Sequence, residues 1–152
     1  MARQDDLREI DAALTRVGRI GRGRAATRLR AEVSGVDLPN AAAGILGALN
    51  QHGPLRASAL AEAADTEAPL VSRALRTLTA DGYVTTRPDP ADGRGRIVAL
   101  TRKGRTTYER FRSGADRITA HAFREWSDDD VAQLRTLMQR VVVDFAATDR
   151  PD

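Results

Sequence analysis

The order of short elements between Leu55 and Thr101 constrains the fold more than any other feature of the sequence. A short alanine-rich segment, 58–64, has helical character, and a brief turn separates it from a longer amphipathic segment, 68–81. Gly82 follows this segment as a helix stop. A short helix, a tight turn and an amphipathic helix in this order predict a helix-turn-helix.

The amphipathic segment 68–81 divides into a buried stripe and an exposed face. Apolar residues at helical spacing form the stripe: Val71, Ala74, Leu75 and Leu78. The residues expected to face outward are Pro69, Ser72, Arg73, Arg76 and Thr77. Proline is compatible with the first turn of a helix, where a backbone N–H has no helical partner.

The residues after Gly82 are typical of a β-hairpin. Two strand-forming segments, 83–87 and 96–101, enclose a loop, 88–93, that contains proline, aspartate and glycine. Two arginines alternate with glycines near the tip, so that their side chains are expected to be exposed. A hairpin directly after a helix-turn-helix predicts a wing.

Helical patterns flank this central region on both sides. A first helix is expected from about Asp5 into the twenties, and three glycines weaken its second half. A second helix is expected to end at Leu49, with Asp37 or Asn40 as its cap.

Two further helices are expected towards the C-terminus. Thr101 is the predicted cap of a long helix that reaches about Glu125. Ser127 and Asp130 resemble a capping box at the start of the last helix.

The predicted fold is mainly α with a small β-hairpin wing, in one domain that covers residues 1–152. Residues 36–101 are expected to form the winged helix-turn-helix, and residues 5–33 and 102–147 a helical dimerisation region. The apolar faces of these flanking helices are too wide for one small winged domain to cover. We therefore expect a homodimer.

Positive charge is concentrated in two segments of the chain. Residues 1–30 carry eight arginines against four acidic residues, and residues 82–112 carry eight basic residues against three acidic ones. The segments 31–81 and 113–152 each have a net charge of −3. Localised positive segments of this kind indicate contact with a polyanion.

The residue content argues against an enzyme or a metal protein. The chain has no cysteine, and its two histidines, His52 and His121, lie on different predicted elements. We expect no catalytic residue, no metal and no cofactor. The charged N-terminus lacks an apolar signal core, and no apolar stretch approaches the length of a membrane span. The expected location is the cytoplasm, without a membrane partner.

Five segments between residues 60 and 104 form a pattern with characteristic spacing: Leu60-Ala-Glu62, Val71-Ser-Arg73, Leu78 through Asp81-Gly-Tyr-Val84, Asp89-Pro-Ala-Asp-Gly-Arg94 and Leu100-Thr-Arg-Lys-Gly104. The piece Asp92-Gly93-Arg94 matches an Asp-x-Arg wing motif. In combination, these segments resemble the MarR (multiple antibiotic resistance regulator) family of winged-helix transcription factors. The resemblance implies a dimeric DNA-binding regulator, often a ligand-responsive one and usually a repressor.

The resemblance also implies how double-stranded DNA is read. Two copies of helix 68–81 would enter successive major grooves, where the Arg73 guanidinium pairs with guanine. Arg94 is expected in the minor groove, with Asp92 orienting it. The other DNA-binding candidates are Arg56, Ser58, Pro69, Leu70, Ser72, Arg76, Arg87 and Arg96.

A small-molecule effector is expected where the dimerisation helices meet the winged region. The candidate contacts are His52, Tyr83, Tyr108 and Phe111, each of which also fits core packing. The predicted function is a homodimeric repressor of a pseudo-palindromic operator, released by a small aromatic or other ligand. An alternative that the sequence leaves open is a winged-helix module that acts through protein contacts, without DNA specificity of its own.

Overall fold

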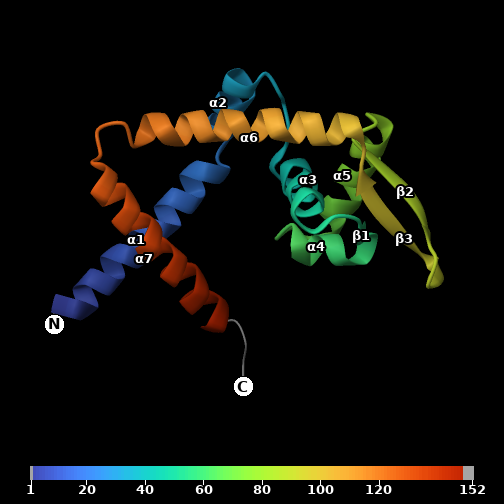
Figure 1. Ribbon diagram of the computed structural model, residues 1–152. Helices are drawn as coiled ribbons and strands as arrows, with labels where there is room; N and C mark the ends of the chain where they lie inside the picture. The colour runs from blue at the N-terminus through green and yellow to red at the C-terminus, as the bar shows by residue number, and fades with distance from the viewer. Residues whose placement is uncertain (1, 149–152) are drawn as a thin grey trace. The chain divides into compact units, whose positions relative to one another are not determined.

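The computed structural model describes residues 2–148 and divides the chain into two compact units. The first unit extends to Asp116 and the second begins at Arg117, so that the boundary falls within helix α6 (Arg102–Ala122). Figure 1 shows the helices and strands of both units.

The first unit begins with helices α1 (Ala2–Arg22) and α2 (Arg24–Ser34), which are separated at Gly23. The remaining elements before α6 form a winged helix-turn-helix: α3 (Asn40–His52), β1 (Leu55–Arg56), the 3-10 turn η1 (Ala57–Ala59), α4 (Leu60–Ala63), α5 (Ala68–Ala80), β2 (Val84–Asp89) and β3 (Asp92–Leu100). In Figure 1 the β2–β3 hairpin extends beyond the helices of this region as a wing. The predicted fold class is therefore confirmed.

Aliphatic side chains from helices and sheet form the core of the winged helix. The largest ones that are almost completely buried are Ile45, Leu46, Leu60, Leu78 and Val98. Each such side chain contributes about 1.5–3 kcal/mol relative to an exposed one. Val71 and Leu78 of α5 point into this core, and Ala74 and Leu75 are partly buried beside them, as the helical spacing predicts.

The sheet has three antiparallel strands in the order β1-β3-β2, one strand more than the predicted hairpin. Leu55 pairs with Val98, and Val84 pairs with Leu100. The hairpin strands are also longer than expected, because they continue through most of the segment 88–93. Pro88 is compatible with this strand because β2 lies at an edge of the sheet, where proline is tolerated at positions whose N–H would face solvent.

Short-range signals set the end of α5 and the start of α6. Gly82 has the left-handed φ of +74°, and the Tyr83 amide donates to the Leu78 carbonyl at 2.8 Å. This is the glycine-terminated helix end that the sequence predicts. At α6 the Gly104 amide donates to Thr101 Oγ1 at 3.0 Å, which confirms the predicted cap.

The N-terminal helices differ from the prediction in two respects. The chain is helical from Ala2 rather than from Asp5, and a second helix, α2, continues after the break at Gly23. The predicted caps of α3, Asp37 and Asn40, are also wrong. Pro39 occupies the cap position, and its side chain has no polar atom that could form a hydrogen bond. Asn40 instead binds the end of α1, with its Nδ2 donating to the Arg22 carbonyl at 3.2 Å.

The second unit contains the end of α6 and helix α7 (Asp128–Thr148). α6 ends at Ala122, slightly earlier than expected, and Phe123 packs edge-to-face on Trp126 at a centroid distance of 5.0 Å. The Asp130 amide donates to Ser127 Oγ at 3.1 Å, and Ser127 Oγ donates to Asp130 Oδ2 at 2.6 Å. The first bond confirms Ser127 as the cap of α7, but the Asp130 carboxylate accepts from the Ser127 hydroxyl and not from the Ser127 backbone amide that a capping box uses.

Candidate nucleic-acid interface

The solvent-facing side of α5 carries half of the residues expected to bind DNA. Pro69, Leu70, Ser72, Arg73 and Arg76 are all exposed, and the opposite side of the helix packs on the core. The helix is fixed in rotation by its buried residues, so these side chains are presented together to solvent. A helix with such a face has the shape and the donors to read base edges in a major groove.

A groove of about 610 Å³ lies between α5 and the sheet. Its polar lining brings together residues that are distant in the sequence: Ser58, Ser72, Arg76, Thr86 and Arg96. Arg96 is held over β2, because its Nη2 donates to Thr86 Oγ1 at 2.9 Å. The structure therefore places four predicted DNA-binding residues around one groove that α5 shares with the wing.

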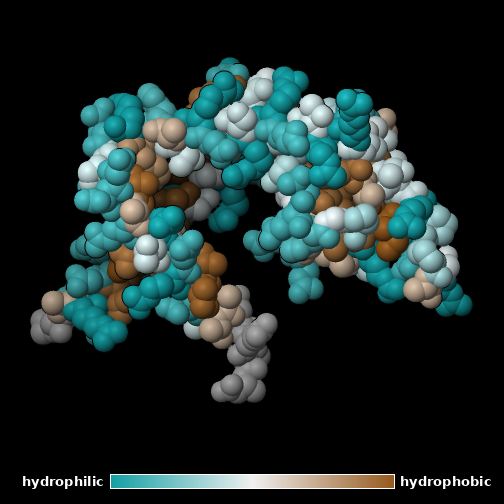
Figure 2. Space-filling model, viewed as in Figure 1, coloured by the Kyte–Doolittle hydropathy of each residue, from teal (hydrophilic) through white to brown (hydrophobic). Residues whose placement is uncertain are grey.

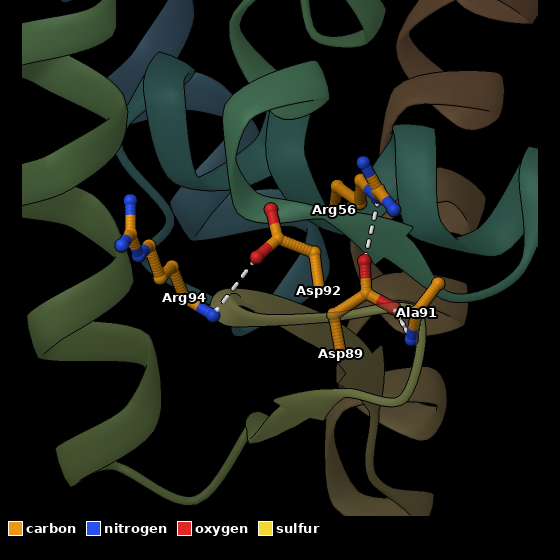
Figure 3. Close-up of polar contacts among 5 residues, drawn as sticks. All are labelled: Arg56, Asp89, Ala91, Asp92 and Arg94. Atoms are coloured by element: carbon orange, nitrogen blue, oxygen red, sulfur yellow. Dashed lines mark hydrogen bonds and ion pairs between the residues drawn. The ribbon is translucent and has the colours of Figure 1, made fainter.

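The wing tip exposes Arg94. Its backbone amide donates to Asp92 Oδ1 at 3.0 Å, a two-residue turn that fixes the backbone at this position. Figure 3 shows the Arg94 side chain pointing away from both nearby aspartates. Among the described residues, its guanidinium has neither an ion pair nor a hydrogen bond, and so it is free to bind a partner.

The remaining two arginines in the predicted set differ from each other. Arg87 is exposed on β2, where it pairs in register with Ile97. Arg56 of β1 forms an ion pair with Asp89, at 2.6 Å between Nε and Oδ2, and its side chain is half exposed. Sequence reasoning missed Asp89, because it assigned this residue to an exposed loop rather than to the buried end of a strand.

The structure does not bring the four expected effector contacts together. Tyr108 and Phe111 stack at a centroid distance of 6.4 Å, with Phe111 buried and Tyr108 packed beside Gly47. His52 is exposed at the end of α3. Tyr83 lines a separate cavity of about 320 Å³ with Leu70 and Arg73, between α5 and the start of α3.

Two findings concern other kinds of site. Within residues 2–148, no group of three or more acidic or histidine side chains is arranged to hold a metal ion. No helix in this same part of the chain has the length and apolar character that crossing a membrane requires.

The fold and the exposed helix face agree with the sequence comparison. Residues 36–95, which include α5 and most of the wing, match the model of the MarR family. This match covers 60 of the 152 residues of the chain. No curated protein is significantly similar to it in sequence.

Solved structures of transcriptional regulators share the fold of this chain. A MarR family transcription regulator with 18% identity aligns over 99% of this chain and 97% of its own, with a TM-score of 0.80. A probable transcriptional regulator from Pseudomonas aeruginosa has 26% identity, covers 76% of this chain and 86% of its own, and gives a TM-score of 0.65. A mutant MarR from E. coli complexed with operator DNA has 21% identity, with coverages of 90% and 96% and a TM-score of 0.70.

Proposed function

We propose that this chain is a homodimeric transcriptional repressor that binds a pseudo-palindromic operator in double-stranded DNA. The observation that supports it most is the groove shared by α5 and the wing, where Ser72, Arg76 and Arg96 face a common space. An exposed helix such as α5 fits the major groove of a duplex, and the arginines of a hairpin such as the wing fit the adjacent minor groove. Binding would repress a gene by occupying its operator.

In this proposal each part of the surface has its own task. Arg73 reads a base edge through two parallel hydrogen bonds, which is worth about 1–3 kcal/mol against a wrong base. Arg94 enters the minor groove, where narrow A·T-rich sequence concentrates negative potential. Arg76, Arg87 and Ser58 contact phosphates, and so they position the protein without specifying sequence.

Apolar residues exposed on α1 and α7 support the dimer. Figure 2 shows hydrophobic surface along both helices. The exposed large side chains on them are Leu7, Ile10, Val17 and Ile20 of α1 and Val131, Leu137, Met138, Val142, Val143 and Phe145 of α7. Pairing two chains through such faces would cover this surface and set two recognition helices about one DNA turn apart.

The proposal includes control by a small aromatic or other ligand. The cavity beside Tyr83 has apolar walls and three charged lining residues, Arg73, Asp37 and Asp81, and so it fits a ligand with an apolar body and polar groups. A ligand bound there would contact Arg73, the predicted base reader. It would lower DNA affinity because it binds the DNA-free dimer more tightly than the DNA-bound dimer. Thermal-shift screening of aromatic acids against the purified dimer tests this part, and a complete absence of stabilising acids would contradict it.

Selection from random double-stranded oligonucleotides, followed by titration of the enriched sequence, tests the main proposal. We expect enrichment of an inverted repeat and an affinity that falls steeply with salt, with a log–log slope of about −0.9 for each neutralised phosphate. Arg87→Gln is expected to reduce that slope by about one. A selection without sequence enrichment would instead support a winged-helix module that acts through protein contacts.

A further inference from the structure

Asp89 is an unusual residue within this basic hairpin because its carboxylate is buried. It is 5% exposed, and it is the only buried acidic side chain among residues 2–148. It lies at the end of β2, where the pairing with β3 is irregular. A buried carboxylate is unfavourable unless hydrogen bonds and an opposite charge compensate for the loss of water.

The two carboxylate oxygens of Asp89 have different partners, as Figure 3 shows: Oδ1 accepts a hydrogen bond, whereas Oδ2 has an ion pair but no hydrogen bond among the described residues. The amide of Ala91, in the turn at the wing tip, donates to Oδ1 at 2.9 Å. Oδ2 lies 2.6 Å from Nε of Arg56, which belongs to β1. Asp89 therefore contacts the tip of the wing on one side and the opposite edge of the sheet on the other.

This ion pair spans the sheet, because β1 and β2 are its two edge strands and β3 lies between them. Gly95 of β3 leaves the space through which the side chains meet. A Cβ on Gly95 would lie 3.2 Å from Asp89 Cβ and 3.3 Å from the Asp92 carbonyl oxygen, closer than side chains usually pack, and 3.4 Å from Asp89 Oδ2. Gly93, two residues earlier in the same strand, has no atom within 4 Å of such a Cβ.

The ion pair also joins the two parts of the surface proposed to bind DNA. β1 leads directly into η1 and α4, the start of the helix-turn-helix, and β2 leads through the turn at residues 90–91 into β3, which carries Arg94. We infer that Asp89 is a positioning residue for DNA recognition. Its carboxylate fixes the wing to β1 through Arg56, and so it determines where Arg94 meets the duplex. This inference rests on the proposed function.

Arg56 could instead contact a DNA phosphate directly. This role predicts the opposite change in DNA affinity for the substitution Asp89→Asn. If Arg56 contacts a phosphate, Asp89→Asn releases its guanidinium and removes a negative charge close to DNA, and binding becomes tighter. If Asp89 positions the wing, the same substitution weakens binding despite the more favourable charge. The direction of the change therefore separates the two roles.

The experiment compares Asp89→Asn, Arg56→Gln and the double variant as full-length proteins on the selected operator. We expect each single variant to bind about threefold to tenfold more weakly, and the double variant to be no weaker than the weaker single, because both changes break one interaction. The slope of log affinity against log salt concentration is expected to be the same for Arg56→Gln as for the wild type, because no phosphate contact is lost. Tighter binding by Asp89→Asn, or a slope lower by about one for Arg56→Gln, would overturn the inference.

Two glycine substitutions in the same strand keep the test valid if Asp89→Asn does not fold. Gly95→Ala pushes on the Asp89 side chain and is expected to weaken operator binding. Gly93→Ala makes the same chemical change in open space and serves as the folding control, with a melting temperature expected to stay close to the wild-type value. Wild-type operator affinity of Gly95→Ala would contradict the positioning role.

Hydrogen exchange on the free protein separates this inference from the proposed function. The backbone amides of residues 91–95 are expected to exchange faster in Asp89→Asn and Gly95→Ala than in the wild type and Gly93→Ala. If the wild type selects no DNA sequence, the proposed function fails, and this measurement still decides whether Asp89 fixes the wing. Unchanged exchange in Asp89→Asn would overturn the inference even if the protein binds an operator.

Discussion

The arginines of the wing region look alike in the sequence but differ in their partners. Arg56 pairs with a buried carboxylate, and Arg96 donates to Thr86. Arg94 is held only through its backbone amide, so its guanidinium keeps its full capacity to bind an anion. A side chain without partners in the free protein loses no internal interaction on binding DNA, and this makes Arg94 the most informative residue to substitute.

Arg94→Ala is expected to weaken operator binding by more than about tenfold, because it removes the predicted minor-groove contact. Its melting temperature is expected to stay close to the wild-type value, since the hydrogen bond to Asp92 uses the backbone and survives the substitution. A gel-shift titration and thermal unfolding measure the two effects. Arg135→Ala on the exposed surface of α7 serves as the control. Wild-type affinity of Arg94→Ala would remove the wing from the proposed interface.

At the scale of the elements, the junction between the wing and α6 depends on a close backbone approach. Gly104 lies in the first turn of α6 and is buried, and a Cβ at this position would lie 1.9 Å from the Tyr83 carbonyl oxygen. Thr101 also donates from Oγ1 to the Gly82 carbonyl at 2.7 Å. These contacts fix the start of α6 to the end of α5 and the start of β2 within the first unit.

Gly104→Ala is expected to lower the free energy of unfolding by about 2 kcal/mol or more, because backbone atoms must move to admit the methyl group. Gly93→Ala is the matched control, since its methyl group would have no neighbour within 4 Å. Urea unfolding of both variants measures the difference. If the two variants unfold at the same denaturant concentration, α6 does not depend on this close approach.

At the scale of the whole molecule, the main unexplained feature of a single chain is its exposed apolar surface. On α7 alone, Val142 is 64% exposed, Val143 66% and Phe145 58%. On α1, Val17 is 66% exposed and Ile20 61%. Contiguous apolar faces of this kind mark sites of protein association, and the proposed dimer would account for them.

Phe145→Glu is expected to shift the dimer to the monomer, because it would place an unpaired charge in an apolar interface. Sedimentation velocity at micromolar concentrations measures the change, and operator affinity is expected to fall with it. Gln133→Glu introduces the same charge elsewhere on α7 and is expected to leave the dimer intact. A wild-type protein that sediments as a monomer at these concentrations would contradict the dimer directly.

The sequence by itself determined the features that depend on near neighbours along the chain. The order of helix, turn, helix and hairpin, the stop at Gly82, and the caps at Thr101 and Ser127 all follow from hydrogen bonds and periodicity within a few residues. The exposed face of α5 follows in the same way, because the helical repeat fixes which side chains lie opposite the core.

Only the tertiary structure decided how distant segments meet. A strand of two residues such as β1 has no periodicity to detect, and its place in the sheet depends on its pairing with β3. The contact of Arg56 with Asp89, and the space that Gly95 leaves for it, depend on three strands at once. Such contacts are set by the packing of the whole domain, because side chains far apart in the sequence become neighbours only when the chain between them has folded.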